Sequence, residues 1–290
     1  MKTNLQTILV TGANGQLGNE LSVIAPQYPG YHFIFIAKEE LAIENFEAVK
    51  KYFAAHAIDY CINCAAYTAV DNAESENENA FLINAGAVGN LAEVCKEKNV
   101  QLIHISTDYV FDGTAIQPYK ETDEANPVSV YGQSKLKGEE LALQNDPSTI
   151  IIRTSWLYAS FKNNFVKTML RLMKEKDSIN VVNDQYGSPT YAADLAGVIM
   201  QIISSGKYKE KPGIYHYTNA GITNWYEFAV AIKNITGSNC TVNPISTAQY
   251  PTAAKRPAFS VLDTAKITAT FGVIIPDWED SLQKCLGLVI

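Results

Sequence analysis

The first half of the chain alternates short apolar runs with longer segments in which apolar residues recur at helical spacing. Short runs rich in β-branched residues and bounded by turn residues are typical of buried strands. The predicted strands are residues 7–11, 31–37, 58–66, 101–107 and 149–156. One helix is predicted directly after the glycines that follow the first strand. Further helices are predicted at residues 45–57, 80–98 and 130–144. This alternation predicts an α/β protein with a doubly wound parallel sheet covered on both faces.

The second half is less regular. Helices are predicted at residues 165–176, from Pro189 to residue 203, and at 225–235. Strands are predicted at residues 178–182 and 213–219, and we expect the latter to extend the sheet. The stretch 236–262 contains Pro244, Pro251 and Pro257 and is predicted to be irregular, because proline cannot donate to a helix or sheet.

Glycines punctuate the junction between the first strand and the first helix, in the order Gly12-x-x-Gly15-x-x-Gly18. In this context Gly12 allows a sharp turn, Gly15 lets the backbone approach a pyrophosphate, and Gly18 lets the helix pack closely on its strand. The free N–H groups of the helix N-terminus then face the phosphates. The position predicts a Rossmann-type dinucleotide site, with a plain glycine turn as the alternative.

A Rossmann-type sheet followed by irregular elements predicts two domains. We assign residues 1–155 plus roughly 186–219 to a dinucleotide-binding domain. Residues from roughly 156–185 plus 220–290 are assigned to a smaller substrate-binding lobe that closes over the cleft. A length of 290 residues with 47% hydrophobic content is sufficient for one large core and a smaller lobe.

Composition narrows the setting. No apolar run approaches the ~18 residues of a membrane span, and the N-terminal residues 1–12 lack the profile of a signal peptide. We therefore expect a cytoplasmic protein without a membrane partner. The net charge of −7 and the pI near 5.2 argue against a nucleic-acid partner, although a few local cations can still bind a small anion.

Two of the five cysteines, Cys61 and Cys64, have the C-x-x-C spacing of metal and redox sites. They lie in a predicted strand, where residues three apart point to opposite faces of the sheet. No second C-x-x-C and no histidine pair accompanies them. We therefore interpret them as core residues.

Polar clusters follow four of the predicted strands, at residues 12–17, 65–68, 106–108 and 154–156. Ligands of parallel sheets bind beyond the C-terminal ends of the strands, so one cleft would gather all four clusters. Tyr131 and Lys135 lie one helical turn apart on the helix before the fifth strand. An ammonium beside a phenol lowers its pKa and suits proton transfer, whereas an isolated pair of this kind is more often a surface contact.

Several longer motifs point to one family. They are TGANGQLG at 11–18, NCAAYTAVDNAE at 63–74, STDYVFDG at 106–113, YGQSK at 131–135, RTSWLY at 153–158, NDQYGSPT at 183–190 and RP at 256–257. Together they resemble the extended short-chain dehydrogenase/reductases, and within them the dTDP-4-dehydrorhamnose reductases. The resemblance covers essentially the whole chain. The glycine motif and Y-x-x-x-K are common to the superfamily, whereas STDYVFDG, RTSW and NDQYGSPT are more specific.

The resemblance implies a reaction and its catalytic residues. Tyr131 would be the proton donor, Lys135 would lower the pKa of Tyr131 and bind the nicotinamide ribose, and Thr107 would hydrogen-bond the substrate oxygen. Hydride from NAD(P)H would reach the C4 ketone of dTDP-4-dehydro-L-rhamnose and give dTDP-L-rhamnose, a precursor of bacterial cell-envelope polysaccharide. Lysine and hydroxyl groups placed in this way stabilise a developing alkoxide.

One position separates neighbouring chemistries. Dehydratases of the superfamily carry an Asp-Glu pair after the threonine, whereas here Asp108 is followed by Tyr109. Reduction needs no such base. An epimerase, or a reductase for another nucleotide sugar, stays open because the same three catalytic residues would serve it. A non-catalytic, reductase-like regulatory subunit stays open as a different class.

The resemblance also assigns the coenzyme contacts: Gly12, Asn14, Gly15, Gln16, Leu17, Gly18, Lys38, Ala42, Ile43, Ala65, Ala66, Tyr67, Thr68, Tyr131 and Lys135. The second strand ends without the carboxylate that selects NAD, and Lys38 there can receive a 2′-phosphate. We expect NADPH, with NADH as a second possibility. Where relatives carry an aspartate for adenine this chain has Ala42, so backbone contacts around Ala42 and Ile43 must serve.

Substrate contacts are assigned to Thr107, Asp108, Tyr109, Trp156 and Arg256. Trp156 would stack on the sugar or nucleotide ring, or else belong to the core. Asp108 would orient the site or only cap a turn. Arg256 would bind a diphosphate as a fork, or else be a surface residue.

Other polar residues have structural explanations of similar weight. His104 alternates within an apolar strand and is interpreted as a core histidine, whereas Asn84 would bridge coenzyme and sheet or cap a helix. Some relatives bind magnesium at a dimer contact, and Glu20 corresponds to one such ligand. The segment ending at Asp194 shows no convincing match to the other acidic segment. We therefore expect no required metal, and a monomer or weak homodimer.

Overall fold

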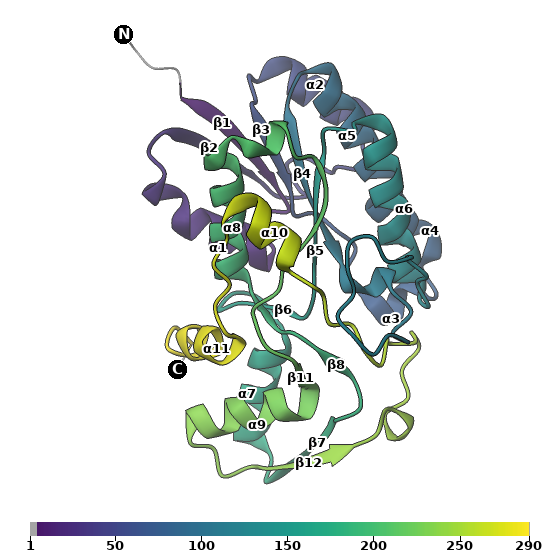
Figure 1. The fold of residues 1–290 in the computed structure, drawn as a ribbon, viewed down its shortest axis with the longest axis vertical. Coiled ribbons are helices and arrows are strands. Elements are labelled where there is room, and N and C mark those ends of the chain that lie inside the picture. Colours follow the sequence, from purple (N-terminus) through teal and green to yellow (C-terminus); the bar gives the residue numbers. More distant parts are fainter. Residues whose placement is uncertain (1–4, 290) are drawn as a thin grey trace.

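The structure is a computed structural model that describes residues 5–289. Residues 1–4 and 290 lie outside the described residues. The prediction that residues 1–12 are not a signal peptide falls partly on them. The centre of the structure is a six-stranded sheet in the order β10-β5-β4-β3-β1-β2, and every pairing in it is parallel (Figure 1). The strands are β1 (Gln6–Thr11), β2 (Tyr31–Ile36), β3 (Tyr60–Asn63), β4 (Gln101–Thr107), β5 (Ile150–Thr154) and β10 (Gly213–His216). The predicted sheet and its extension by residues 213–219 are confirmed.

Helices cover both faces of this sheet and make a three-layer domain (Figure 1). One layer contains α2 (Phe46–Ala55), α5 (Ala87–Glu97) and α6 (Val130–Asn145). The opposite layer contains α1 (Gln16–Ile24), α8 (Ala192–Ser205) and α10 (Ala265–Phe271). The chain returns from β2 across β1 to β3, so the strand order reverses between β1 and β3. Ligands of open parallel sheets bind outside the carboxyl ends of the strands at such a switch point.

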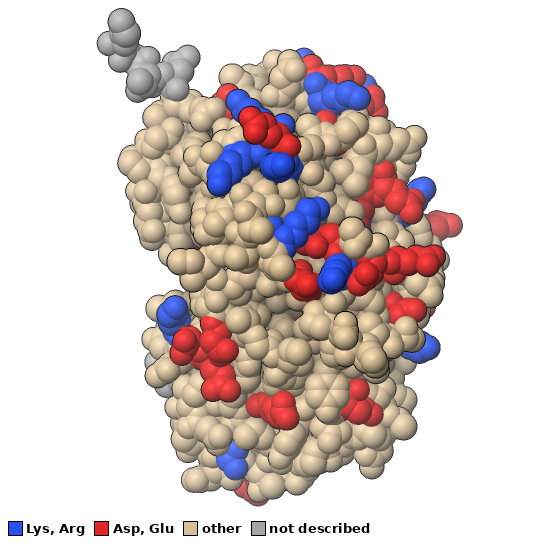
Figure 2. Space-filling model, in the orientation of Figure 1, with Lys and Arg blue, Asp and Glu red and all other residues tan. Residues whose placement is uncertain are grey.

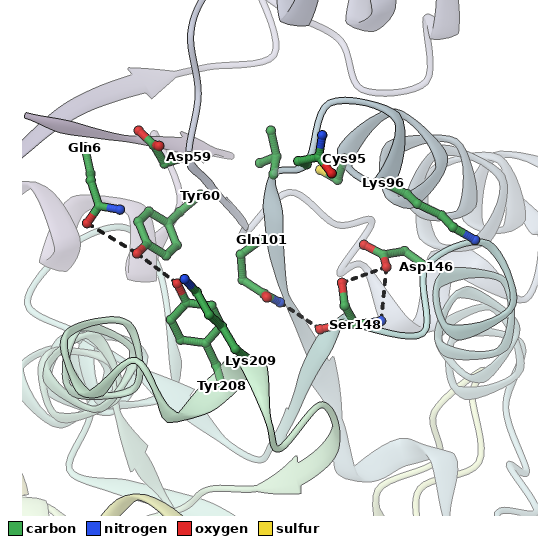
Figure 3. A pocket seen from close by; sticks show the side chains of 12 residues that line it. Gln6, Asp59, Tyr60, Cys95, Lys96, Gln101, Asp146, Ser148, Tyr208 and Lys209 are labelled. Carbon is green, nitrogen blue, oxygen red and sulfur yellow. Dashed lines mark hydrogen bonds between the residues drawn. The ribbon is translucent and has the colours of Figure 1, made fainter. Parts of the chain in front are cut away.

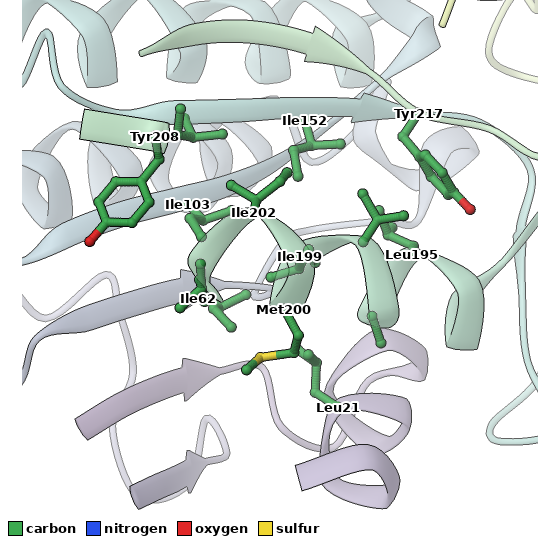
Figure 4. Packing of buried hydrophobic residues seen from close by; sticks show 14 of the residues in the cluster. Leu21, Ile62, Ile103, Ile152, Leu195, Ile199, Met200, Ile202, Tyr208 and Tyr217 are labelled. Atoms are coloured by element: carbon green, nitrogen blue, oxygen red, sulfur yellow. The ribbon is translucent and has the colours of Figure 1, made fainter. Parts of the chain in front are cut away.

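Apolar side chains fill both spaces between the layers. Strand residues such as Ile62, Ile103 and Ile152 pack against Leu195 and Ile199 of α8 on one face (Figure 4). A second cluster on the other face joins alternate strand residues to α2 and α5. Cys61 belongs to this second cluster, whereas Cys64 packs against the first. The prediction that the two cysteines point to opposite faces is confirmed.

The smaller lobe has its own core. Its helices are α7 (Phe165–Glu175), α9 (Trp225–Thr236) and α11 (Trp278–Leu286). Its strands pair as β6 (Leu157–Tyr158) with β9 (Thr190–Tyr191), β8 (Tyr186–Gly187) with β11 (Thr223–Asn224), and β7 (Ser178–Val182) with β12 (Thr241–Ile245). The domain boundaries stay a prediction. Helix α10 differs from them, because Ile267 and Phe271 pack into the core of the large sheet.

The expectation that residues 236–262 are irregular is wrong at β12, which includes Pro244 and pairs in parallel with β7. This sheet has only two strands within the described residues. Proline is tolerated in such an edge strand, where its missing N–H can face away from the partner.

The helix predicted at residues 80–98 is interrupted. It consists of α4 (Asn77–Phe81), a π-helical turn at Leu82–Gly86, and α5. A short helix, α3 (Val70–Ala73), precedes it. Single π turns are frequent at functional sites, and this one carries the fully buried Asn84.

On the face shown in Figure 2, Lys and Arg side chains lie among Asp and Glu side chains and do not form a separate basic area. Within residues 5–289, no helix combines the length and the apolar character that crossing a bilayer requires.

Candidate active site

A cavity of about 950 Å³ lies at the carboxyl ends of the central strands and extends to the smaller lobe. All four polar clusters predicted from the sequence contribute to its lining. The predicted coenzyme residues that line it are Gly12, Asn14, Gly15, Gln16, Leu17, Lys38, Ile43, Ala65, Ala66, Tyr67, Thr68, Tyr131 and Lys135. The predicted substrate residues that line it are Thr107, Asp108, Tyr109 and Trp156.

The glycine loop forms one wall. Gly12 has φ of +65°, and a Cβ atom there would come within 2.6 Å of the Ala65 backbone nitrogen. Gly15 is the N-cap of α1, whose first residues Gln16 and Leu17 line the cavity. Gly18 does not line it, because its role is close packing: a Cβ atom would lie 2.6 Å from the Ala13 carbonyl oxygen. This cradle fits a dinucleotide pyrophosphate.

The second wall, the loop at residues 65–68, is fixed by Asn84. The Asn84 side chain accepts a hydrogen bond from the Tyr67 nitrogen (2.9 Å) and donates to the Tyr67 oxygen and to Ser134 Oγ, both at 3.0 Å. Asn84 therefore clamps this loop to α6. The capping interpretation is wrong, because Asn84 lies inside the π turn and does not cap a helix, whereas its contact with the coenzyme stays a prediction.

Thr107 and Tyr131 both line the cavity. Thr107 Oγ1 donates to Asp108 Oδ1 at 3.0 Å and accepts from the Tyr109 nitrogen at 3.2 Å. Burial raises the pKa of Tyr131 to about 12, although a hydrogen bond with Thr107 lowers it. Burial also raises the pKa of Asp108 to about 6. With a pKa of about 12, the Tyr131 phenol is protonated at neutral pH.

Lys135 has other partners in this structure. Its buried Nζ atom donates to the Ile105 carbonyl oxygen at 2.7 Å and lies 3.4 Å from His104 Nε2. Burial lowers the pKa of Lys135 to about 8, and the charge of Glu139 opposes that shift. Burial is the largest cause of the raised pKa of Tyr131, and the role of Lys135 toward Tyr131 stays a prediction.

A buried ion pair lies behind these residues. Arg153 donates to both oxygens of Glu139, with Nη2 to Oε2 at 2.6 Å and Nε to Oε1 at 2.9 Å. Ser106 Oγ also donates to Glu139 Oε1 at 2.5 Å. The ion pair connects α6 to β5, and the hydrogen bond from Ser106 connects α6 to β4. It thereby fixes the catalytic helix against the strand ends.

The far wall of the cavity is aromatic. Trp156 and Trp225 both line it, and their rings stack with centroids 3.6 Å apart at 11°. Trp156 has φ of +48°, which is uncommon for a bulky residue. A Cβ atom at Gly187 would lie 2.6 Å from the Trp156 indole, so only glycine leaves room for the ring.

Some predicted site residues lie elsewhere or already have partners. Ala42 does not line the cavity, although its neighbours Leu41 and Ile43 do. Arg256 pairs with Asp71 as a fork, at 2.7 and 3.1 Å, and does not line the cavity either. Lys38 does line it and forms a 2.8 Å ion pair with Glu44. The assigned roles of these residues stay predictions.

The sequence alone did not point to several lining residues. They include Glu44, Asn79, Ile83, Lys162, Asn163 and Trp225. Trp225 opens a helix more than sixty positions after Trp156, and only the fold brings the two together. The signal in the sequence that could have pointed to Trp225 was its position directly after Asn224, which caps the helix.

A smaller hollow of about 350 Å³ lies at the opposite, amino end of the strands (Figure 3). Asp59, Lys96, Asp146 and Lys209 are among its lining residues, and Figure 3 shows these groups spread around the rim. Ser148 donates to Asp146 Oδ1 from its backbone nitrogen and its hydroxyl group. No glycine is among the described residues that line this hollow, so the larger cavity with its glycine loop is the candidate active site.

Two carboxylates bear on the metal expectation. Glu20 is buried, and its pKa is raised first by burial and further by the charge of Asp194. Asp194 Oδ2 already accepts from Asn219 at 2.7 Å and Ser281 at 2.5 Å. Among the described residues, no group of three or more His, Cys, Asp or Glu side chains is placed to hold a metal ion. The absence of a required metal stays a prediction.

A parallel dinucleotide-type sheet, a glycine cradle and a tyrosine–lysine helix that border one cavity define an oxidoreductase of the extended short-chain dehydrogenase/reductase class. The comparisons narrow this class. Residues 6–289 match the family model described as RmlD substrate binding domain. The chain belongs to this family, that of the dTDP-4-dehydrorhamnose reductases.

Individual relatives agree along nearly the whole chain. A dTDP-4-dehydrorhamnose reductase of Aggregatibacter actinomycetemcomitans is 44% identical over 96% of this chain and 97% of its own. The crystal structure of a dTDP-4-dehydrorhamnose reductase from Clostridium acetobutylicum has a TM-score of 0.93 at 42% identity, covering 98% of this chain and 99% of that one. The Bacillus anthracis enzyme, crystallised in complex with NADP, has a TM-score of 0.93 at 38% identity and the same coverage. The resemblance inferred from the motifs is confirmed.

Proposed function

We propose that this protein reduces the C4 ketone of dTDP-4-dehydro-L-rhamnose with NADPH and so forms dTDP-L-rhamnose. The observation that carries the proposal is that Thr107, Tyr131 and the glycine loop line one cavity. A ketone oxygen beside both hydroxyl groups would receive the proton from Tyr131, and Thr107 would donate to it by turning its hydroxyl proton from Asp108 to the substrate.

The residues present fit a nicotinamide dinucleotide. The close approach of Gly12 to the Ala65 backbone and the exposed start of α1 suit its pyrophosphate. The cavity then continues past Ile43 on one side and to Lys135 on the other. When bound, the coenzyme supplies the hydride. NADPH is preferred because Lys38 lies at the end of β2, where a 2′-phosphate is read, and because a relative was crystallised with NADP.

Tyr131 would deliver the proton. Its pKa of about 12 keeps the phenol protonated at neutral pH, so the group is ready to act as an acid. In this structure Asp108 accepts the single proton of the Thr107 hydroxyl. Lys135, charged below pH of about 8, would bind the nicotinamide ribose and stabilise the developing alkoxide.

The aromatic wall would bind the nucleotide sugar. Trp156 offers a ring face of the size of a sugar or base, and Trp225 stacks behind it. Tyr109 packs edge-on against Tyr131 with centroids 5.5 Å apart and closes the space around the reacting carbon. For Arg256, binding of the diphosphate requires that it exchange or share its Asp71 partner.

The test is oxidation of NADPH by the native protein with dTDP-4-dehydro-L-rhamnose, with the product identified by NMR. We expect one dTDP-L-rhamnose for each NADPH consumed. Tight copurified nucleotide with no net NADPH consumption would identify an epimerase instead. Retained NADPH binding without turnover of any nucleotide sugar would indicate a regulatory subunit.

We further propose that the protein acts in the cytoplasm as a monomer or weak homodimer, without a membrane or nucleic-acid partner. Its acidic net charge and the mixed charges on the face shown in Figure 2 support the absence of a nucleic-acid partner. Sedimentation at several protein concentrations tests the oligomeric state. A stable dimer at low concentration would contradict it.

A further inference from the structure

A chain of buried polar groups runs from β1 to the catalytic lysine. Thr11 Oγ1 donates to Asn63 Oδ1 at 2.7 Å, and Asn63 Nδ2 lies 3.0 Å from His104 Nδ1. His104 Nε2 in turn lies 3.4 Å from Lys135 Nζ. Thr11, Asn63, His104 and Lys135 are all buried and belong to four different elements. Such a chain constrains the position of every proton along it.

The orientation of the Asn63 amide is fixed by the Ala65 backbone N–H group, which can donate a hydrogen bond but cannot accept one. The Ala65 backbone N–H donates to Asn63 Oδ1 at 3.2 Å, and the Thr11 hydroxyl donates to the same atom. The atom that faces these two donors must therefore be the oxygen. It follows that the amide NH₂ group faces His104 and donates to it.

The amide fixes the tautomer of His104. Because Nδ1 accepts from Asn63, it carries the lone pair, and the proton of the neutral ring is on Nε2. Burial and the nearby Lys135 charge hold the pKa of His104 well below its usual value, so the ring is neutral. An N–H group is thus directed at Lys135 Nζ.

We propose that His104, fixed by Asn63 as the Nε2–H tautomer, is a positioning residue for Lys135. An ammonium cannot donate to an N–H group, so the protons of Lys135 turn to the Ile105 carbonyl oxygen and to the coenzyme side of the cavity. A neutral amine can accept from Nε2–H, so the same contact favours the uncharged form of the lysine. His104 is therefore more than the core histidine expected from its apolar strand.

Other groups also face Lys135. Glu139, one turn further along α6, favours its charge, and the Cys64 thiol, which follows β3, is neutral because burial raises its pKa. Tyr131 lies one turn before it on α6, and Asp108 lies beyond Tyr131 at the end of β4. Burial and the His104 N–H oppose these charge-favouring groups. The contribution of His104 is separable because its replacement leaves the carboxylates in place.

The first test reads the tautomer in the native protein. Long-range ¹⁵N–¹H spectra of histidine-labelled protein distinguish a protonated ring nitrogen from one with a lone pair. The chain has four histidines, and the resonances that disappear in His104→Gln belong to His104. We expect a neutral ring protonated at Nε2. Protonation at Nδ1, or an imidazolium near neutral pH, would overturn the proposal.

The second test follows the Lys135 titration by ¹³C NMR of lysine-labelled protein, assigned with Lys135→Met. In His104→Gln the flexible amide can turn its oxygen to the ammonium, so we expect the Lys135 pKa to rise by at least ~0.5 unit toward 10.4. His216→Gln is the matched control, because His216 is also buried but contacts Arg153 and the Tyr119 carbonyl. An unchanged or lower Lys135 pKa in His104→Gln would refute the positioning role.

The consequence for catalysis rests on the proposed function, but neither NMR test needs substrate. If the reductase reaction fails while the tautomer and the lysine shift are observed, the role of His104 stands and the proposed reaction falls. If the reaction is found, the apparent pKa of the alkaline limb of kcat/KM should be higher in His104→Gln than in the native protein, by the same amount as the Lys135 pKa. A structural role alone would lower activity without moving that limb.

Discussion

Glu139 and Arg153 form a bidentate ion pair inside the protein, directly behind the catalytic residues. Their side chains are 2% and 4% exposed. Removing one partner of such a pair leaves the other charge buried without compensation, which is far costlier than losing an exposed ion pair. The pair therefore couples the stability of the domain to the position of α6.

We expect Glu139→Gln to lower the free energy of unfolding by about 3–5 kcal/mol, because it leaves the Arg153 charge unpaired. Denaturant unfolding measures this effect. Glu140→Gln is the control, since Glu140 forms an exposed pair with Lys137 and its loss should cost less than about 1 kcal/mol. Equal effects of the two variants would contradict the account of the buried pair.

Trp225 supports the proposed sugar site from behind Trp156. We expect Trp225→Ala to raise the KM for the nucleotide sugar roughly 10-fold, because a lost aromatic pair and the packing around it amount to about 1.4 kcal/mol. The Kd for NADPH should stay within about twofold of the native value, and Trp225→Phe should recover most of the lost affinity. A Trp225→Ala variant that loses coenzyme affinity equally would indicate general disruption of the cavity.

Lys38 is the predicted reader of the coenzyme 2′-phosphate. We expect Lys38→Met to reduce the ratio of kcat/KM for NADPH over NADH by about 10-fold, the size of one hydrogen bond to a charged group. Lys50→Met, at an exposed position on α2 that pairs with Glu93, should leave the ratio unchanged. If the native enzyme itself prefers NADH, the assignment of Lys38 is wrong.

The pH dependence of kcat/KM should follow the ionisation of Lys135. Its pKa is lowered to about 8, so the lysine is charged below that pH and neutral above it, whereas Tyr131 stays protonated up to about pH 12. Because the charged form is the one proposed to act, kcat/KM should fall as the pH rises through about 8. Steady-state rates on both sides of this value measure the limb. A profile that stays flat until the tyrosine ionises would exclude Lys135 as its origin.

Much of the fold was predictable because its signals are local. Strand β4 was predicted at its observed limits, 101–107, and α6 was predicted to within one residue at its end. Apolar periodicity marks such elements directly. The glycine cradle was also predictable, because Gly12 and Gly15 act through the backbone conformation of their own segment.

The missed features depend on partners that are distant in sequence. Trp225 joins the cavity only because α9 packs beside Trp156, and Arg256 finds Asp71 across the fold. Where the 80–98 helix is interrupted, Asn84 bonds to Tyr67 and Ser134, far along the chain. No local pattern in the sequence specifies these contacts.

The electrostatics of the site were the hardest to predict. Spacing correctly placed Tyr131 and Lys135 on one helix that borders the cavity, and the tuning of the tyrosine by its lysine stays a prediction. In the structure, burial raises the pKa of Tyr131, and the Lys135 ammonium is directed at a carbonyl oxygen. Burial follows from the whole fold, so residue spacing cannot supply it.

The central claim is that Tyr131 delivers the proton in reduction of dTDP-4-dehydro-L-rhamnose. The most direct measurement compares NADPH-dependent turnover of this substrate by the native protein and Tyr131→Phe, with NADPH binding measured for both. The account predicts rapid native turnover and a loss of at least ~10²-fold in kcat for the variant, with the Kd for NADPH unchanged. Native-like turnover by Tyr131→Phe would contradict the claim.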